Sequence, residues 1–391
     1  MAKGWIMELT FGAVFVCMSM PAIAQPTPQT MRTVQCHPSG TLKRLFLLSQ
    51  TGVLSVAFSP HQRDLYILES TISPVTTSMS ARGVELVRKI DLDTGKVIGT
   101  IYLQKPGPGL HSTLSSTATG SMALSQNGHR LYVADDQQRI NVISTLRWKV
   151  LRRFPVLPLD PRQILLSPSG KTLFVRSNLI PSYGFALAAY ATATGKREWI
   201  SSYEPGHFNF MSLAYWPAER SLVSAVLGTT PYNTVGGDQG LRLIDPKTGR
   251  LGRTVVRGPF AFAVPGRGLT LYAARYSNNA AIASMDLLRL EGESSKITAE
   301  VSNLKGLGEL AYNVTDNVLY AGYLSSKPDQ SVFTAYESTS LKPLASVTCN
   351  SFMLAGSMGF MRVAKHRNGI YVVGPYWLWL LKTNKVGIFA R

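Results

Sequence analysis

The sequence predicts an all-β fold, a seven-bladed β-propeller of four-stranded antiparallel blades. A tight polar turn followed by a short apolar run recurs seven times along the chain, and repeats of about 40 to 50 residues are typical of propellers. Helical periodicity is lacking over any long window. The 33 Gly and 22 Pro residues fall mostly between the apolar runs, as turn chemistry expects.

Each repeat is marked by an aliphatic residue directly after the polar turn. The seven markers are Leu65, Leu131, Leu173, Leu222, Leu271, Leu319 and Ile370, at spacings of 66, 42, 49, 49, 48 and 51 residues. A second alternating segment follows each marker, and in several copies a Gly turn such as Thr194-Gly195-Lys196 leads to a third. With the strand before each turn, every repeat of about 45 residues has four short strands, which make one blade.

The chain divides into three predicted segments. Residues 1–24 have the order of a secretory signal peptide, with an apolar run from Leu9 to Met20 and small residues before a cleavage site after Ala24. Residues 25–40, which contain three Pro, are expected to be a flexible lead-in, and 41–391 a single propeller domain. No stretch reaches the ~20 apolar residues of a membrane-spanning helix. We therefore expect a secreted, periplasmic protein with no transmembrane segment.

Two cysteines remain after cleavage, Cys36 and Cys349. In an oxidising compartment such a pair predicts a disulfide bond. No C-x-x-C-H haem sequence and no cluster of thiols or His accompanies them, so we expect neither haem nor zinc. The first and last blades must be joined, and either Leu42 to Leu48 or Val386 to Ala390 could supply the closing strand. The bridge fits both cases, and the sequence leaves the choice open.

The chain is strongly basic, with 40 Lys plus Arg against 22 Asp plus Glu and a formal net charge of +18. An exported protein does not normally meet nucleic acid, so nucleic acid is not an expected partner. Two interpretations remain open. The charge could attract an anionic partner, such as lipid head groups, a cell-wall polymer or an acidic protein. Alternatively, it could be a solvated basic surface suited to an acidic medium.

Two stretches resemble a known repeat. Leu124 to Val150, which contains Gly128-His129-Arg130-Leu131-Tyr132-Val133, and Ile90 to Val97 are similar to the YVTN-type propeller repeat, while the other blades match in spacing and turn type. That family, with the related heavy chain of periplasmic amine dehydrogenases, implies a seven-bladed ring with scaffold, binding or docking roles. It carries no fixed catalytic motif. We therefore expect no catalytic residue, no cofactor and no metal.

The candidate site lies on the connections that follow the second and fourth strands of each blade, because these include every long connection. In a propeller they share one face, and function tends to lie on long loops above a rigid scaffold. Hydrogen-bonding and aromatic residues suited to a binding mouth are frequent there. The candidates are His111, Tyr183, Glu204, His207, Tyr232, Asn233, Arg275, Tyr323, Tyr376 and Trp377. Each could alternatively do no more than cap its own loop.

The function expected first is that of a non-catalytic periplasmic binding or scaffold protein. It would present this face to a protein, peptide or glycan, as a monomer or as a subunit of a complex. One alternative is a lactonase or hydrolase with a site at the channel mouth, where His111 or His207 would be the base. Another is a non-catalytic subunit of a periplasmic redox complex similar to amine dehydrogenase.

Overall fold

The structure, a computed structural model, contains strands and turns and no helix in the residues that it describes. These are 36–37, 42–47, 53–61, 63–70, 85–103, 121–135, 137–156, 159–179, 185–203, 209–227, 239–277, 284–325, 330–349, 360–364, 369–373 and 377–382. The strands lie in the unit Gln35–Arg391 and form six four-stranded sheets and one five-stranded sheet.

The first four sheets each consist of four consecutive strands. Sheet 1 contains β3 (Val53–Phe58), β4 (Asp64–Ser70), β5 (Glu85–Asp91) and β6 (Val97–Tyr102). Sheet 2 contains β7 (Ser121–Leu124), β8 (Arg130–Ala134), β9 (Arg139–Ser144) and β10 (Lys149–Pro155). Sheet 3 contains β11 (Leu159–Leu166), β12 (Thr172–Leu179), β13 (Phe185–Ala191) and β14 (Arg197–Tyr203). Sheet 4 contains β15 (Asn209–Trp216), β16 (Ser221–Leu227), β17 (Gly240–Ile244) and β18 (Leu251–Arg257).

The remaining sheets include the two strands from the N-terminal part of the chain. Sheet 5 contains β19 (Phe260–Pro265), β20 (Leu271–Tyr276), β21 (Ser284–Glu291) and β22 (Lys296–Lys305). Sheet 6 contains β23 (Glu309–Asn313), β24 (Val318–Leu324), β25 (Ser331–Glu337), β26 (Pro343–Cys349) and β1 (Cys36–His37). Sheet 7 contains β27 (Phe360–Ala364), β28 (Gly369–Val373), β29 (Trp377–Lys382) and β2 (Leu42–Leu47).

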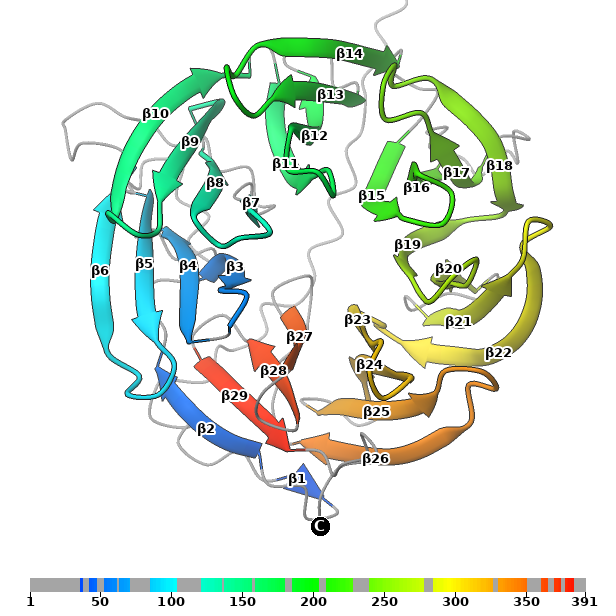
Figure 1. Ribbon diagram of the computed structural model, residues 1–391. Helices are drawn as coiled ribbons and strands as arrows, with labels where there is room; N and C mark the ends of the chain where they lie inside the picture. Colours follow the sequence, from blue (N-terminus) through cyan, green and yellow to red (C-terminus); the bar gives the residue numbers. More distant parts are fainter. Residues whose placement is uncertain are drawn as a thin grey trace, which may run out of the picture. The chain divides into compact units, whose positions relative to one another are not determined.

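The sheets stand around a common centre like the blades of a propeller (Figure 1). The first strand of each sheet is innermost, and the fourth forms the outer rim. Neighbouring strands pair antiparallel. The predicted all-β propeller of four-stranded antiparallel sheets is confirmed.

The ring is closed by the N-terminal one of the two candidate segments. β2 pairs with β29, with Leu42 opposite Leu381 and Leu47 opposite Trp377. The alternative, Val386 to Ala390, lies outside the described residues. β2, a strand from the N-terminal part of the chain, forms the outer edge of sheet 7. Strands from both ends of the chain therefore pair in the same sheet.

The marker residues of the repeat form the core. Leu65, Leu131, Leu173, Leu222, Leu271 and Leu319 are each 0 % exposed. Neighbouring sheets pack face to face: Leu68 of sheet 1 lies in one apolar cluster with Leu131 and Val133 of sheet 2. Truncating one such leucine to Ala is expected to cost about 2 to 5 kcal/mol. The repeat is therefore a pattern of sheet-to-sheet packing.

In three of the polar turns, a serine side chain accepts the backbone N–H that begins the second strand. Ser59 Oγ accepts the backbone N–H of Asp64 at 3.0 Å, and Ser125 Oγ accepts that of Arg130 at 2.9 Å. Ser167 Oγ accepts the N–H of Thr172 at 3.1 Å. A short hydroxyl side chain thus satisfies the donor that begins the second strand, which explains why Ser recurs at this position.

Candidate functional site

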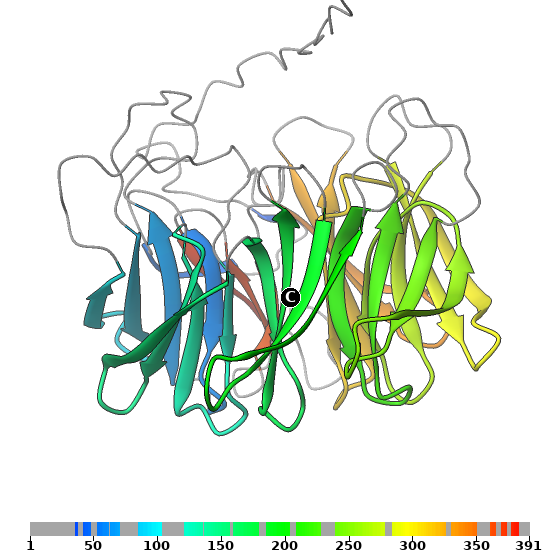
Figure 2. The same cartoon turned by 90° about the horizontal axis from the view of Figure 1, so that it is seen from above.

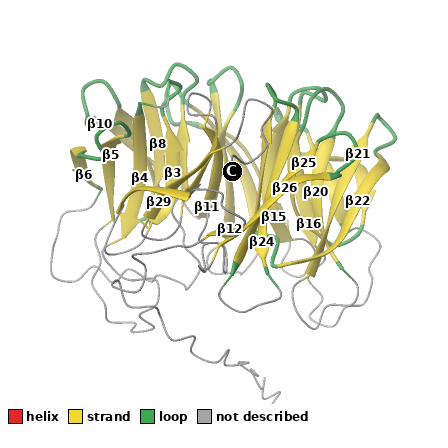
Figure 3. Ribbon diagram, turned by 90° about the horizontal axis from the view of Figure 1, so that it is seen from below, coloured by secondary structure: helices red, strands yellow, loops and turns green. Residues whose placement is uncertain are grey.

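The two faces of the propeller differ in the length of their connections. The turns from first to second and from third to fourth strand have four to six residues and lie on one face, the tight-turn face (Figures 2 and 3). The second and fourth strands end on the opposite face, the long-connection face. Its connections include 71–84, 103–120, 228–239 and 350–359, but also the two residues 258–259. Every connection of more than six residues between the described strands lies on the long-connection face.

Most of the candidate binding residues lie outside the described part of the chain. These are His111, Tyr183, Glu204, His207, Tyr232, Asn233 and Tyr376. Trp377 is the first residue of β29, where the backbone is described. Arg275 and Tyr323 are described in full, on β20 and β24. Each comes four residues after its repeat marker, so the two occupy equivalent places on neighbouring sheets at the long-connection face.

This place, the second-strand end, is polar in five of the sheets. It holds Glu69, Asp135, Ser177, Arg275 and Tyr323, whereas sheet 4 has Val226. Glu69, Asp135 and Ser177 are fully buried. Buried polar groups require partners, so each of these sheets carries a polar network below the long-connection face.

In sheet 1 the network is a buried ion pair. Glu69 Oε2 lies 3.3 Å from Arg88 Nε, and the Glu69 side chain is 0 % exposed while that of Arg88 is 33 % exposed. Glu85, also buried, stands opposite Ser70 in the same pair of strands. Two buried carboxylates therefore border the connection 71–84.

In sheet 2 one carboxylate holds a whole turn. Asp135 Oδ1 accepts the backbone N–H groups of Gln137 at 3.1 Å and of Arg139 at 3.0 Å. Asp135 Oδ2 accepts Arg139 Nε and Nη2 at 3.0 and 2.9 Å and Asn141 Nδ2 at 2.9 Å. Asn141 Oδ1 in turn accepts Arg153 Nε at 2.8 Å. Asp135 thus uses its lone pairs inside the sheet, and its role is to fix the turn from β8 to β9.

In sheet 3 two positive charges lie together. Burial lowers the pKa of Arg176 to about 10, and the positive charge of Arg162 lowers it further in the same direction. Arg162 belongs to β11 and Arg176 to β12, next to the register pair of Gln163 with Arg176. The two guanidinium groups therefore lie close enough for their charges to interact.

In sheet 5 the candidate Arg275 pairs with two carboxylates. Its Nη2 donates to Asp286 Oδ2 at 3.0 Å and to Glu300 Oε1 at 3.1 Å. Asp286 Oδ1 also accepts the backbone N–H of Asn303 at 3.2 Å. The guanidinium therefore crosslinks β20, β21 and β22. Its remaining N–H groups are the part that could serve a partner.

In sheet 6 the candidate Tyr323 begins a row of hydroxyl groups. Its Oη lies 2.9 Å from Thr334 Oγ1, which lies 2.8 Å from Ser346 Oγ. The row crosses β24, β25 and β26. Burial raises the pKa of Tyr336, on β25, well above its usual range, and the neighbouring Tyr323 adds to that rise. The Tyr336 phenol is therefore a neutral hydrogen-bonding group at ordinary pH.

The described residues include neither a cluster of metal ligands nor a membrane-spanning helix. In the described ranges no group of three or more His, Cys, Asp or Glu side chains could hold a metal ion. The same part of the chain contains no helix long and apolar enough to cross a membrane.

Comparisons with known proteins identify the fold. No family model matches the chain, and no curated protein sequence does. The chain is similar to the β-propeller domain of Cps50 (Swd1) from Myceliophteria thermophila, with a TM-score of 0.56 and 11 % identity over 87 % of this chain and 99 % of that one. It is also similar to hydrazine synthase of Kuenenia stuttgartiensis, with a TM-score of 0.57 and 15 % identity over 86 % of this chain and 95 % of that one. The chain is a β-propeller.

Sequence reasoning overlooked Glu69, Asp135 and Ser177. The signal was present, because each is a polar residue four positions after a buried marker, where strand alternation places an inward side chain. Arg275 and Tyr323 were selected for their place on long connections, and they prove to be the half-buried members of the same series.

Proposed function

We propose that this chain is an exported binding or scaffold protein that presents its long-connection face to a protein, peptide or glycan. The observation that carries the proposal is the asymmetry of the two faces. One face carries turns of four to six residues, while connections such as 103–120 and 228–239 join the strand ends of the other. Inserted chain on one side of a rigid scaffold is where binding residues concentrate.

The polar second-strand ends support the same face. Glu69 forms an ion pair with Arg88, and Asp135 accepts hydrogen bonds from the β8–β9 turn. These networks hold the rim of the face in a fixed geometry. A rim that does not rearrange lowers the entropic cost of binding.

The test replaces two candidate residues in one variant, Tyr232→Ala in the connection 228–239 and Trp377→Ala at the start of β29. Ile98→Ala, an exposed apolar residue near the tight-turn end of the outer strand β6, is the matched control. Co-purification from the native host, read by native mass spectrometry, should be lost in the double variant and kept in the control. A partner retained by the double variant would contradict the proposal. Turnover of ester or lactone substrates, abolished by His111→Ala or His207→Ala, would favour the hydrolase alternative.

We also propose seven blades of the YVTN type, a periplasmic location and a Cys36–Cys349 disulfide. The bridge is supported by register, because Cys36 of β1 stands directly opposite Cys349 of β26. It would fasten the strand that precedes β2 to the outer edge of sheet 6. Intact mass should rise by two hydrogen atoms on reduction, and two thiols alkylated without a reductant would refute the bridge.

A further inference from the structure

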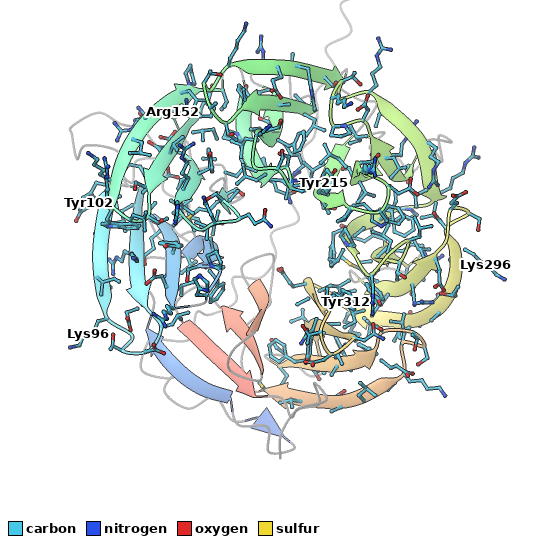
Figure 4. The ribbon with its side chains drawn as sticks, viewed as in Figure 1. Lys96, Tyr102, Arg152, Tyr215, Lys296 and Tyr312 are labelled. Carbon is cyan, nitrogen blue, oxygen red and sulfur yellow. The ribbon has the colours of Figure 1, made fainter. Side chains whose placement is uncertain are left out.

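The turns from third to fourth strand share one feature in sheets 1 to 6. Each contains a residue with positive φ, and an exposed Lys or Arg follows that residue directly. The positive-φ residues are Gly95, Trp148, Gly195, Gly249, Ser295 and Leu341. The cations after them are Lys96, Lys149, Lys196, Arg250, Lys296 and Lys342, here named the cation ring. Lys96 and Lys296 lie on opposite sides of the propeller (Figure 4).

The fold uses the backbone of these residues, not their charge. The N–H of Lys196 donates to Thr194 Oγ1 at 3.1 Å, and that of Lys342 donates to Ser340 Oγ at 3.1 Å. No member of the cation ring forms an ion pair with another residue that the structure describes. Any exposed polar side chain would serve the turn, so the six charges are available to a partner.

The turns that carry the cation ring are fastened to the neighbouring sheet. Trp199 Nε1 of β14 donates to the carbonyl oxygen of Pro246 at 3.1 Å, and Ser201 Oγ donates to that of Gly249 at 2.9 Å. Arg253 Nη1 of β18 donates to the carbonyl oxygen of Glu293 at 3.0 Å. The outer strand of one sheet thus holds the turn of the next, and the charges project from a fixed frame.

The whole tight-turn face is basic. Its described turns, with the strand residue on either side, hold fourteen exposed Lys and Arg against five exposed Asp and Glu. The carboxylate of Asp245, one of the five, accepts the N–H of Lys247 at 2.8 Å and the hydroxyl of Thr248 at 2.8 Å. An extended field of one sign at this density attracts anions.

The same face carries the two most exposed large apolar side chains of the described residues. Leu146 is 73 % exposed in the turn 145–148, and Val314 is 60 % exposed in the turn 314–317. The first lies in sheet 2 and the second in sheet 6. Apolar tips among cations are the combination by which proteins bind the interface of an anionic membrane.

We propose that the tight-turn face docks on a bilayer surface that contains anionic phospholipids. The cation ring would contact head-group phosphates, while Leu146 and Val314 would enter the interface between head groups and acyl chains. A membrane fits better than a soluble polyanion for two reasons. Charges on opposite sides of the ring require an extended flat partner, and a polyanion has no apolar interior into which Leu146 and Val314 could insert. This inference is independent of the partner at the long-connection face, which would then point away from the membrane.

The charge test compares two ends of the same strands. Arg250→Gln with Lys296→Gln removes two cations from the tight-turn face, and Arg257→Gln with Lys305→Gln removes two exposed cations from the far ends of β18 and β22. The assay is co-sedimentation with phosphatidylcholine vesicles that contain about 30 % phosphatidylglycerol, an anionic membrane of the kind that polybasic surfaces bind. The first pair should weaken partitioning about 25-fold, at roughly five-fold for each charge, and the second pair should leave it nearly unchanged. Equal losses in both pairs, or no binding by the wild type, would overturn the proposal.

The apolar test separates a membrane from a polymer. Leu146→Ser with Val314→Thr should weaken vesicle binding about ten-fold or more and leave retention on dextran sulfate unchanged. Tyr102→Ser, at the far end of β6, is the matched control and should change neither. If the tip variant binds vesicles as tightly as the wild type does, the surface recognises polyanions through charge alone, and the membrane proposal is wrong.

Discussion

Removing the carboxylate of Asp135 should destabilise sheet 2 more than any exposed charge change in the propeller. Asp135→Ala leaves the buried Asn141 amide and two backbone N–H groups without their acceptor. The Arg139 side chain is 28 % exposed, so water can compensate part of its loss. A buried donor left unsatisfied costs about 1 to 3 kcal/mol, and we expect about 3 kcal/mol in total.

The assay is thermal unfolding followed by circular dichroism, with hydrogen exchange of β8 and β9 as a local readout. At about 2.1 cal/mol/K of unfolding entropy per residue, 3 kcal/mol corresponds to a fall in Tm of about 4 °C in a unit of this size. Asp135→Asn, which keeps one acceptor oxygen for the backbone, should lose less than half of that. Arg139→Gln should also lose less. A Tm for Asp135→Ala within about 1 °C of the wild type would refute the assignment of Asp135 as the fixed point of this turn.

Three further predictions concern the closure, the turns and the core. Breaking the proposed bridge with Cys36→Ser should lower the Tm, since the chain-entropy model gives at most roughly 6 kcal/mol for so long a loop; an unchanged melting curve would count against it. Gly128→Ala would place a Cβ 2.6 Å from Pro60 Cδ at a φ of +73°, whereas the Cβ of Gly170→Ala would meet nothing within 4 Å at a φ of +68°. Chemical denaturation should therefore show a larger loss of unfolding free energy for Gly128→Ala, by about 1 to 2 kcal/mol. Burial raises the pKa of Tyr66 to about 12, whereas the phenol of an unfolded chain ionises near pH 10. The contribution of Tyr66 to stability is therefore complete below about pH 10 and is lost toward pH 12. A Tyr66→Phe variant should resist alkaline unfolding better than the wild type.

The sheets were predictable because each repeats a local pattern. A marker leucine and the Ser-containing turn that precedes it lie within one short stretch of chain, and the burial of Leu131 or Leu173 follows from that stretch alone. Ring closure was not predictable in this way. Leu42 to Leu48 and Val386 to Ala390 both read as short strands, and the choice depended on pairing with β29 across the whole chain.

The polar networks show the same limit at the candidate site. Sequence reasoning could place Arg275 on a strand end, but its pairing with Asp286 and Glu300 requires the register of three strands. The cation ring was visible in part as Thr-Gly-Lys turns. Its extent appears only when Trp148, Ser295 and Leu341 are found to adopt the positive φ that Gly adopts in the other copies.

The measurement that tests the central claim most directly is native mass spectrometry of the protein purified gently from its own cells, with the Tyr232→Ala/Trp377→Ala variant beside the wild type. We expect a bound protein, peptide or glycan on the wild type, lost from the double variant and retained by Ile98→Ala. A partner held equally by all three would contradict binding at the long-connection face.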